Sequence, residues 1–148
     1  MTNLVTEVAD TVSETPESVA ISFDGNEQTY ETLWERTGQF AAALDERGIG
    51  EGDRVGIYLP NLPQFVTAFY GTLRAGGIVV PMNPQYKARE ISHLLSDSGA
   101  KAVVTLSENA EAVAEVQSDT DVSTVVSVGE PAESATDFEA FLADETLP

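Results

Sequence analysis

Three glycine-rich segments are the first residues in this sequence that could do chemistry, because loops that bind phosphate are commonly built from glycines. They are GIGEGDRVG (48–56), LRAGGIVVP (73–81) and SDSGAK (96–101). Each follows a helical pattern and precedes a strand-like run. A phosphate loop runs the other way, from a strand into a helix whose N-terminal amides point at the anion. We therefore interpret all three segments as helix ends and sharp turns.

Few other side chains could act in catalysis or bind a metal ion. The sequence contains no cysteine and a single histidine, His93, which excludes thiol catalysis, disulfides and metal sites of the Cys and His type. His93 lies beside an inward leucine of a predicted helix, with only Glu90 and Asp97 at helical spacing, so we expect it to be exposed. Acidic pairs such as Asp45–Glu46 would hold a hard cation weakly and are interpreted as surface. The residues alone thus predict no catalytic and no metal-binding residue.

The charge of the chain is strongly negative and unevenly distributed. Twenty-five acidic residues oppose seven basic ones, which gives a net charge of −18. All seven bases lie between Arg36 and Lys101 together with six of the acids, so the other 19 acids lie in the flanks. This composition argues against a nucleic-acid partner, which needs clustered Lys and Arg. We interpret the flanks as solvated acidic surface rather than interaction tails. An acid-rich, lysine-poor surface resembles that of proteins from salt-accumulating halophiles.

Length and hydrophobic pattern limit the class of protein. The 148 residues fit a single domain, 1–148, and no apolar run approaches the ~18 residues of a membrane span. The N-terminal stretch MTNLVTEVADTVSE lacks the basic start and apolar core of a secretory signal. We therefore expect a cytoplasmic protein without a transmembrane segment.

The first third of the chain predicts a helix near 4–12, a β-hairpin and a longer helix. Val19, Ile21 and Phe23 alternate with smaller or polar residues, Asp24-Gly25 suits a turn, and residues 27–29 return as the second strand. Thr29 is the expected N-cap of the longer helix, and Gly48 is expected to end it in the left-handed conformation. Residues at helical spacing form its inward face: Leu33, Thr37, Phe40, Ala41 and Leu44.

The remainder alternates between strands and helices. A strand over 55–59 stops at Pro60, and Pro63 opens a helix in which four residues fall on one stripe: Phe65, Phe69, Leu73 and Gly76. IVVP (78–81) is interpreted as a strand covered on both faces. A helix over 87–98, a strand over 100–106, a helix over 108–117 and a strand over 122–128 follow.

Near the C-terminus, Thr136 and Glu139 have the spacing of a capping box before a short helix with Phe138, Phe141 and Leu142. The alternation of strands with helices predicts an α/β fold. It is a mainly parallel sheet with helices on both faces, preceded by an N-terminal helix and a β-hairpin.

Longer stretches resemble a known family. TYETL (29–33) matches the first core motif of AMP-forming acyl-CoA synthetases, and LRAGGIVVPMN (73–83) matches the second. GDRVGIYLPN (52–61) and YKAREISHLLSDSGAK (86–101) follow the order and spacing of the same family. The resemblance is strongest over 29–105 and covers nearly the whole chain. The sequence therefore looks like the opening of an adenylate-forming enzyme, in the superfamily that also holds luciferases and peptide-synthetase adenylation domains.

The resemblance implies a two-step reaction. A fatty acid carboxylate attacks the α-phosphate of ATP, held with Mg²⁺, and the thiol of coenzyme A then displaces AMP from the acyl-adenylate. The Pro-Lys-Gly phosphate loop, the acidic ribose contact, the aromatic adenine contact and the mobile-domain lysine of the family are not found in this sequence. The chain is thus expected to be an inactive N-terminal fragment whose main partner is the remainder of the enzyme. On the helix over 87–98, Lys87 and Arg89 match basic positions that contact coenzyme A phosphates in some members.

Two alternatives remain at this level. The same scaffold serves aryl-acid ligases and peptide-synthetase adenylation domains, and a stand-alone binding or assembly module without catalysis fits the sequence as well. The unpaired edge of a partial parallel sheet also predicts self-association, so a homo-oligomer is expected.

Overall fold

Five parallel strands form the central sheet of the computed structural model, which describes residues 4–23, 25–130 and 132–142. Their order across the sheet is β4-β3-β5-β6-β7, and every neighbouring pair is parallel. The strands are β3 (Arg54–Tyr58), β4 (Ile78–Pro81), β5 (Ala102–Leu106), β6 (Thr124–Val128) and β7 (Thr136–Asp137). The predicted parallel sheet is confirmed, and β7 is an addition that the sequence did not suggest.

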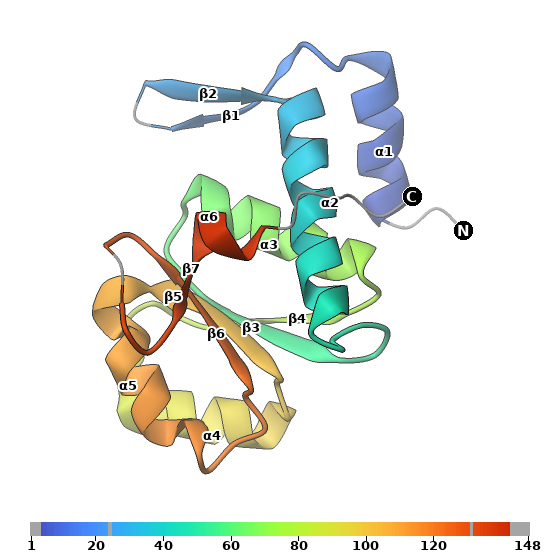
Figure 1. The fold of residues 1–148 in the computed structure, drawn as a ribbon. Coiled ribbons are helices and arrows are strands. Elements are labelled where there is room, and N and C mark those ends of the chain that lie inside the picture. The colour runs from blue at the N-terminus through green and yellow to red at the C-terminus, as the bar shows by residue number, and fades with distance from the viewer. Residues whose placement is uncertain (1–3, 24, 131, 143–148) are drawn as a thin grey trace.

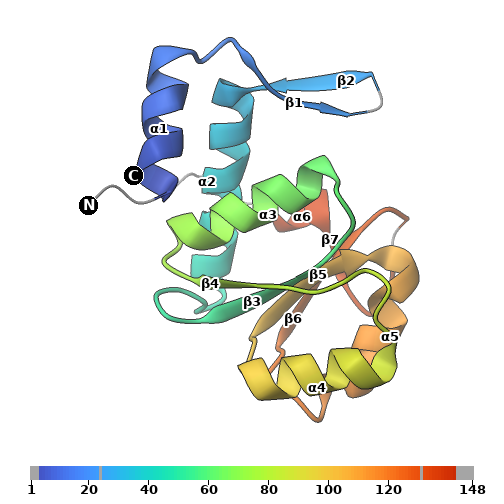
Figure 2. The ribbon, with the colours of Figure 1, turned by 180° about the vertical axis from the view of Figure 1, so that it is seen from behind.

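Helices cover both faces of this sheet, as predicted (Figures 1 and 2). One face carries α2 (Tyr30–Glu46), α3 (Pro63–Arg74) and the short α6 (Phe138–Phe141). The other carries α4 (Ala88–Ser98) and α5 (Ser107–Gln117). An apolar cluster lies on each side, one around Phe40 and Ile57 and the other around Val103 and Leu95. Alternate residues of each central strand pack in one cluster or the other, because successive side chains of a strand point to opposite faces.

The N-terminal segment extends away from the sheet. Helix α1 (Leu4–Glu14) packs beside α2, and the antiparallel hairpin of β1 (Val19–Phe23) and β2 (Asn26–Thr29) projects from the start of α2 (Figure 1). Gly25 has a φ of 82°, as its turn requires, while its predicted partner Asp24 lies outside the described residues. The Thr29 hydroxyl accepts a hydrogen bond from the Thr32 amide at 3.2 Å, which confirms the predicted cap.

The three glycine-rich segments are helix ends, as predicted. Gly48, Gly76 and Gly99 follow α2, α3 and α4 with φ values of 74°, 85° and 68°. After α2 the Ile49 amide donates to the Leu44 carbonyl at 3.0 Å and the Ile49 side chain is buried, so the chain folds back on the last turn. None of the three segments therefore aims a helix N-terminus at a ligand.

One expectation about the sheet is met only in part. The IVVP segment was expected to be covered on both faces, and Val79 and Val80 do pack against the apolar clusters on the two faces. However, β4 is the edge strand, and Ile78 is 51% exposed. A short apolar run identifies a strand without giving its place in the sheet. In the structure, β4 pairs with β3 on one side, from the pair Arg54 and Ile78 to the pair Ile57 and Pro81. Its other edge is left open.

Two helix details also differ from the sequence analysis. The deepest face of α3 holds small residues, Thr67, Ala68, Gly71 and Thr72, whereas Phe65 and Phe69 are only partly buried against the core. Small residues are needed there because α3 lies directly against α2. At α6 the cap is Asp137, whose carboxylate accepts from the amides of Glu139 and Ala140, and Thr136 belongs to β7. The capping-box prediction was thus displaced by one residue.

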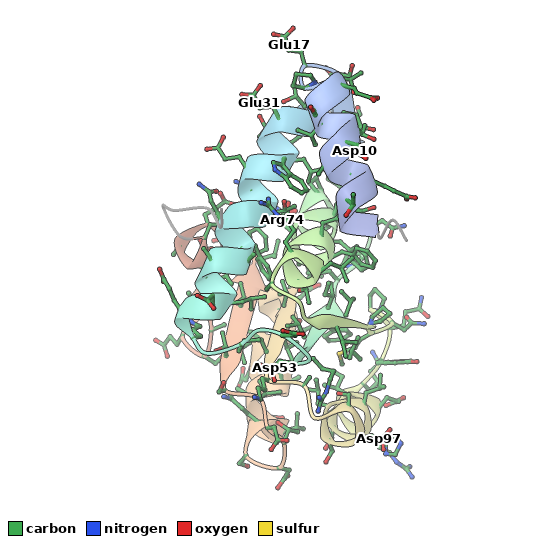
Figure 3. The ribbon with its side chains drawn as sticks, turned by 90° about the vertical axis from the view of Figure 1, so that its right-hand side faces the viewer. Asp10, Glu17, Glu31, Asp53, Arg74 and Asp97 are labelled. Atoms are coloured by element: carbon green, nitrogen blue, oxygen red, sulfur yellow. The ribbon has the colours of Figure 1, made fainter. Side chains whose placement is uncertain are left out.

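The N-terminal edge of the sheet is held by charged side chains. Figure 3 labels Asp53 at this edge. Its carboxylate lies 2.9 Å from Lys101 Nζ and accepts from the Gly50 amide at 2.9 Å. The Gly50 hydrogen bond, followed by Lys101, lowers the pKa of Asp53. Arg54 Nε donates to the Ser98 carbonyl at 2.7 Å, which joins β3 to the end of α4.

Candidate functional site

The connection from β4 to α4 is a fixed loop at the carboxyl edge of the sheet. The Asn83 side-chain oxygen accepts from the Gln85 amide at 2.9 Å, and the Tyr86 amide donates to the Asn83 carbonyl at 3.0 Å. Pro84 lies inside this turn, where its fixed φ suits the bend. The Tyr58 hydroxyl, at the end of β3, donates to the Tyr86 carbonyl. These hydrogen bonds hold the loop, and therefore the first residues of α4, in a fixed position relative to β3.

Tyr58 is suited to this anchoring role by its environment. Its side chain is 3% exposed, and burial, with a smaller contribution from the charge of Glu90, raises its pKa. Because the phenol stays protonated, it remains a hydrogen-bond donor to the loop. The sequence analysis missed this contact, since it joins two residues 28 positions apart and depends on the pairing of β3 with its neighbours.

A surface hollow of about 730 Å³ lies along the first turns of α4. Its lining residues come from the loop and the helix: Tyr86, Arg89, Glu90, His93 and Leu94. Tyr86 and Leu94 are half-buried and pack against the apolar cluster beneath, while the three charged or polar side chains are exposed. The hollow thus combines an apolar base with a polar rim. The predicted exposure of His93 is confirmed, but its position beside a hollow was not foreseen.

Five of the seven basic side chains are engaged within the chain. Arg36 forms a two-pronged ion pair with Glu139, at 3.0 and 2.6 Å, which lowers the pKa of Glu139, and Lys101 pairs with Asp53. Arg54 donates to backbone carbonyls of neighbouring loops.

The other two engaged bases stack on aromatic rings. Figure 3 labels Arg74 between α2 and α3. Its guanidinium lies 3.7 Å from the centre of the Trp34 ring and donates to the Trp34 carbonyl at 2.7 Å. Arg47 lies 4.5 Å from the centre of the Phe141 ring. Such contacts hold the cations against the fold.

The two remaining bases are Lys87 and Arg89, the residues singled out by sequence. Both side chains are exposed, and in the part of the chain that the structure describes no ion pair, side-chain hydrogen bond or ring contact engages either. Lys87 is the N-cap residue of α4 and gives the helix no side-chain cap, and Arg89 borders the hollow. Both charges therefore add to the positive end of the helix dipole, where an anion is favoured.

The other predicted ligands of the family find less support in this chain. In the described ranges, none of the connections that lead from a strand into a helix contains a glycine, so no glycine loop cradles a triphosphate. The same residues contain no group of three or more His, Asp or Glu side chains arranged to hold a metal ion. The residues present thus fit neither ATP phosphates nor Mg²⁺. No helix among the described residues is long and apolar enough to cross a membrane.

Comparison with known proteins identifies the family to which the chain belongs. Residues 8–146 match the family of AMP-binding enzymes, and the chain belongs to that family. It is 48% identical over 90 residues to a long-chain-fatty-acid–CoA ligase of Yersinia pestis and 39% identical over 99 residues to one of Bacillus subtilis (strain 168). These alignments cover 60% and 67% of this chain but 16% and 18% of the two relatives. The chain therefore corresponds to less than a fifth of each relative's length.

Solved structures agree with this assignment. A long-chain-fatty-acid-CoA ligase from Archaeoglobus fulgidus superimposes with a TM-score of 0.80 and 27% identity, over 89% of this chain and 28% of that one. A benzoate CoA ligase from Burkholderia xenovorans LB400 gives a TM-score of 0.85 with 21% identity, over 99% and 30% of the two chains. At that lower identity the second likeness shows the fold alone.

Proposed function

We propose that this chain, as one subdomain over 1–148, is the N-terminal part of an ATP-dependent fatty acyl-CoA synthetase. The complete enzyme joins a fatty acid to coenzyme A through an acyl-adenylate and releases AMP and pyrophosphate. The names of the Yersinia and Bacillus relatives support this substrate class. ATP and Mg²⁺ are then bound by the remainder of the enzyme, which is also the principal partner of this chain.

The alternatives are less well supported. A plipastatin synthase of Bacillus subtilis (strain 168) matches at 35% identity over 103 residues, below the 48% of the fatty-acid ligase, so a peptide-synthetase adenylation domain ranks second. A stand-alone binding module and an aryl-acid ligase share the same scaffold. The coding sequence beyond residue 148 separates these proposals. A continued frame with a phosphate-loop motif supports the synthetase, and a stop codon supports the module.

Within the synthetase, we assign Lys87 and Arg89 to the phosphates of coenzyme A. One observation carries this assignment: in a chain of net charge −18, the two bases that no other group among the described residues engages lie two residues apart at the start of one helix. Exposed bases without internal partners stabilise the fold little, whereas they suit an anionic ligand. Their part in the reaction is to hold and orient coenzyme A, and Tyr58 holds the loop that presents them.

Titration of the chain with coenzyme A tests the assignment. Amide chemical shifts should change over residues 86–94. The double substitution Lys87→Gln and Arg89→Gln should weaken binding by roughly 3–10-fold, as expected for two exposed charge contacts. Arg47→Gln, which removes one positive charge from a base that does not line the hollow, is the control for charge loss and should leave the affinity within about twofold. Equal losses in both variants, or shift changes elsewhere, would contradict the assignment. A parallel titration with ATP and Mg²⁺ should show no micromolar binding.

A further inference from the structure

A second hollow, the N-terminal hollow, lies where α1, β1, α2 and α3 meet, at the opposite end of the molecule from α4 (Figures 1 and 2). Its volume is about 300 Å³, and each element supplies one apolar side chain to its wall: Val8, Ile21, Leu33 and Val66. All but Leu33 are only half-buried, so apolar surface stays open to solvent. The volume is at the lower limit of small-molecule sites. The hollow therefore has room for one large side chain rather than for a whole ligand.

Oxygen atoms without internal partners border this apolar surface. The hydroxyls of the lining residues Tyr30 and Tyr70 take part in no hydrogen bond among the described residues. Glu7 also lines the hollow, and its exposed carboxylate has no ion-pair partner in the same part of the chain. Gln28 lies directly opposite Ile21 in the hairpin, and its buried side-chain oxygen accepts from no described donor. Because these oxygens are all acceptors, the surface suits a ligand rich in donors.

The charged side chains around the N-terminal hollow are acidic. The first 35 residues contain eight acids and no lysine or arginine. On α1, Glu7, Asp10 and Glu14 are exposed and are spaced three and four residues apart, so they follow one stripe beside the hollow. Figure 3 labels Asp10, Glu17 and Glu31 at this end of the molecule. A second copy of the chain would bring the same acids to this surface, so repulsion disfavours it as the occupant at moderate ionic strength.

We propose that the N-terminal hollow is a docking site for a basic segment of a partner protein, in which one large apolar side chain flanked by lysines or arginines enters the hollow. The apolar wall buries this anchor, while the flanking cations meet the acids of α1 and donate to the unpartnered oxygens. Phe23 extends the surface, since it lies two residues beyond Ile21 on the same face of the hairpin and is 41% exposed. A buried apolar anchor within a polar rim is the usual anatomy of a protein interface. No residue of the α4 site takes part.

Three short peptides separate the anchor from the charge. Acetyl-Lys-Lys-Trp-Lys-Lys-amide (the tryptophan peptide) carries both, acetyl-Lys-Lys-Gly-Lys-Lys-amide (the glycine peptide) lacks the anchor, and acetyl-Glu-Glu-Trp-Glu-Glu-amide reverses the charge. Each is titrated into the chain in about 0.15 M KCl while amide signals are followed. We expect the tryptophan peptide to change the signals of residues 7–11, 20–23 and 66–70. The glycine peptide should bind at least about fivefold more weakly, and the acidic peptide should not bind. Equal affinity of the two lysine peptides, or signal changes confined to other residues, would overturn the proposal.

Screening and charge removal test the acidic rim. In about 1 M KCl the affinity for the tryptophan peptide should fall roughly 3–10-fold, because the Debye length shrinks to about 3 Å. Glu7→Gln combined with Asp10→Asn should weaken both lysine peptides by roughly 2–5-fold and leave their ratio unchanged. Glu111→Gln combined with Glu115→Gln removes the same charge from exposed positions of α5 and is the matched control, with an affinity within about twofold of the native chain. Equal losses in the two pairs would mean attraction by net charge alone, and docking at α1 would be wrong.

Filling the hollow tests the anchor. Ala20 lines the hollow, so Ala20→Phe should place a ring inside it and abolish the preference for the tryptophan peptide over the glycine peptide. Ser22→Phe, at an exposed position of the same strand, is the matched control and should keep the preference. Thermal unfolding of each variant shows whether the fold persists; where it does not, the two lysine peptides on the native chain still decide.

Two results of these measurements would overturn the placement of the anchor. One is a preference for the tryptophan peptide that survives in a folded Ala20→Phe variant. The other concerns the chain without peptide: if the signals of residues 7–11 and 20–23 shift with protein concentration in about 0.15 M KCl, a second copy fills the hollow and the proposed partner does not.

Discussion

Gly71 offers a sharp test of how the helical layer is packed. A Cβ atom at this position of α3 would lie 2.7, 2.8 and 3.0 Å from Cδ1, Cβ and Cγ of Phe40 on α2. Phe40 cannot move aside easily, because it is fully buried and its ring contacts those of Phe138 and Phe141 at 5.9 and 5.3 Å between centres. Gly71→Ala should therefore force the two helices apart.

The expected magnitude follows from two opposing effects. Overpacking a core typically costs about 1–3 kcal/mol, whereas alanine in place of glycine inside a helix gains about 1 kcal/mol. Because three Phe40 atoms are approached within 3.0 Å, the cost should exceed the gain and leave a net loss of about 1–2 kcal/mol. For a chain of this size that lowers Tm by about 2–8 °C.

Thermal unfolding followed by circular dichroism in molar KCl provides the measurement. Gly50→Ala is the matched control, since its new Cβ would meet only the Ala75 carbonyl at 3.8 Å, and its Tm should stay close to that of the native chain. Phe40→Leu, which replaces the rigid ring, should remove much of the Gly71→Ala penalty in a double-mutant cycle. A Gly71→Ala variant as stable as the native chain would refute the close contact between α2 and α3.

Three further predictions concern the whole chain. Thermal stability should rise between dilute buffer and molar KCl, because the Debye length falls from about 10 Å at 0.1 M to about 3 Å at 1 M and screens a net charge of −18; an unchanged Tm would contradict this. In molar KCl, stability should be fully present above about pH 4.5 and be lost as pH falls through the lowered pKa values of Asp53 and Glu139; Asp53→Asn should flatten this acid limb, and an unchanged limb would contradict the prediction. Sedimentation in high salt should show self-association through exposed apolar side chains such as Ile78 and Phe23; a strictly monomeric chain would argue against it.

Local sequence signals predicted the ends of the elements well. Thr29, Gly48, Pro63 and Gly99 each mark a helix terminus through their own backbone or hydroxyl chemistry, and the structure confirms all four. These features depend on residues within one turn of each other. Prediction failed where the outcome depends on distant neighbours, as at β4, whose apolar sequence does not reveal that one of its edges is open.

The candidate site likewise combines features that local sequence predicts with features that depend on distant residues. Sequence resemblance singled out Lys87 and Arg89, but the sequence did not show that the other five bases are engaged within the fold. That distinction requires the partners of those five, which include Glu139, 103 residues from Arg36, and Trp34, 40 residues from Arg74. The hollow beside α4 and its anchor at Tyr58 likewise arise from the loop meeting β3. Long-range pairing therefore separates the five engaged bases from Lys87 and Arg89, the two that we propose as ligand contacts.

Among the described residues, the polar contacts differ between the two edges of the sheet, and this difference supports the proposal of a ligand at the carboxyl edge. At the N-terminal edge, Asp53 pairs with Lys101 and accepts from the Gly50 amide, and Arg54 donates to the carbonyls of Ser98 and Gly52, so these charged groups serve the fold. At the carboxyl edge, beside α4, the anchoring contact is the neutral Tyr58 hydroxyl, which fixes the loop without using Lys87 or Arg89. Open α/β sheets bind ligands at the carboxyl ends of their strands. Because a neutral contact holds the loop there, the two cations remain free for an anion, and removing them should weaken coenzyme A binding without unfolding the chain.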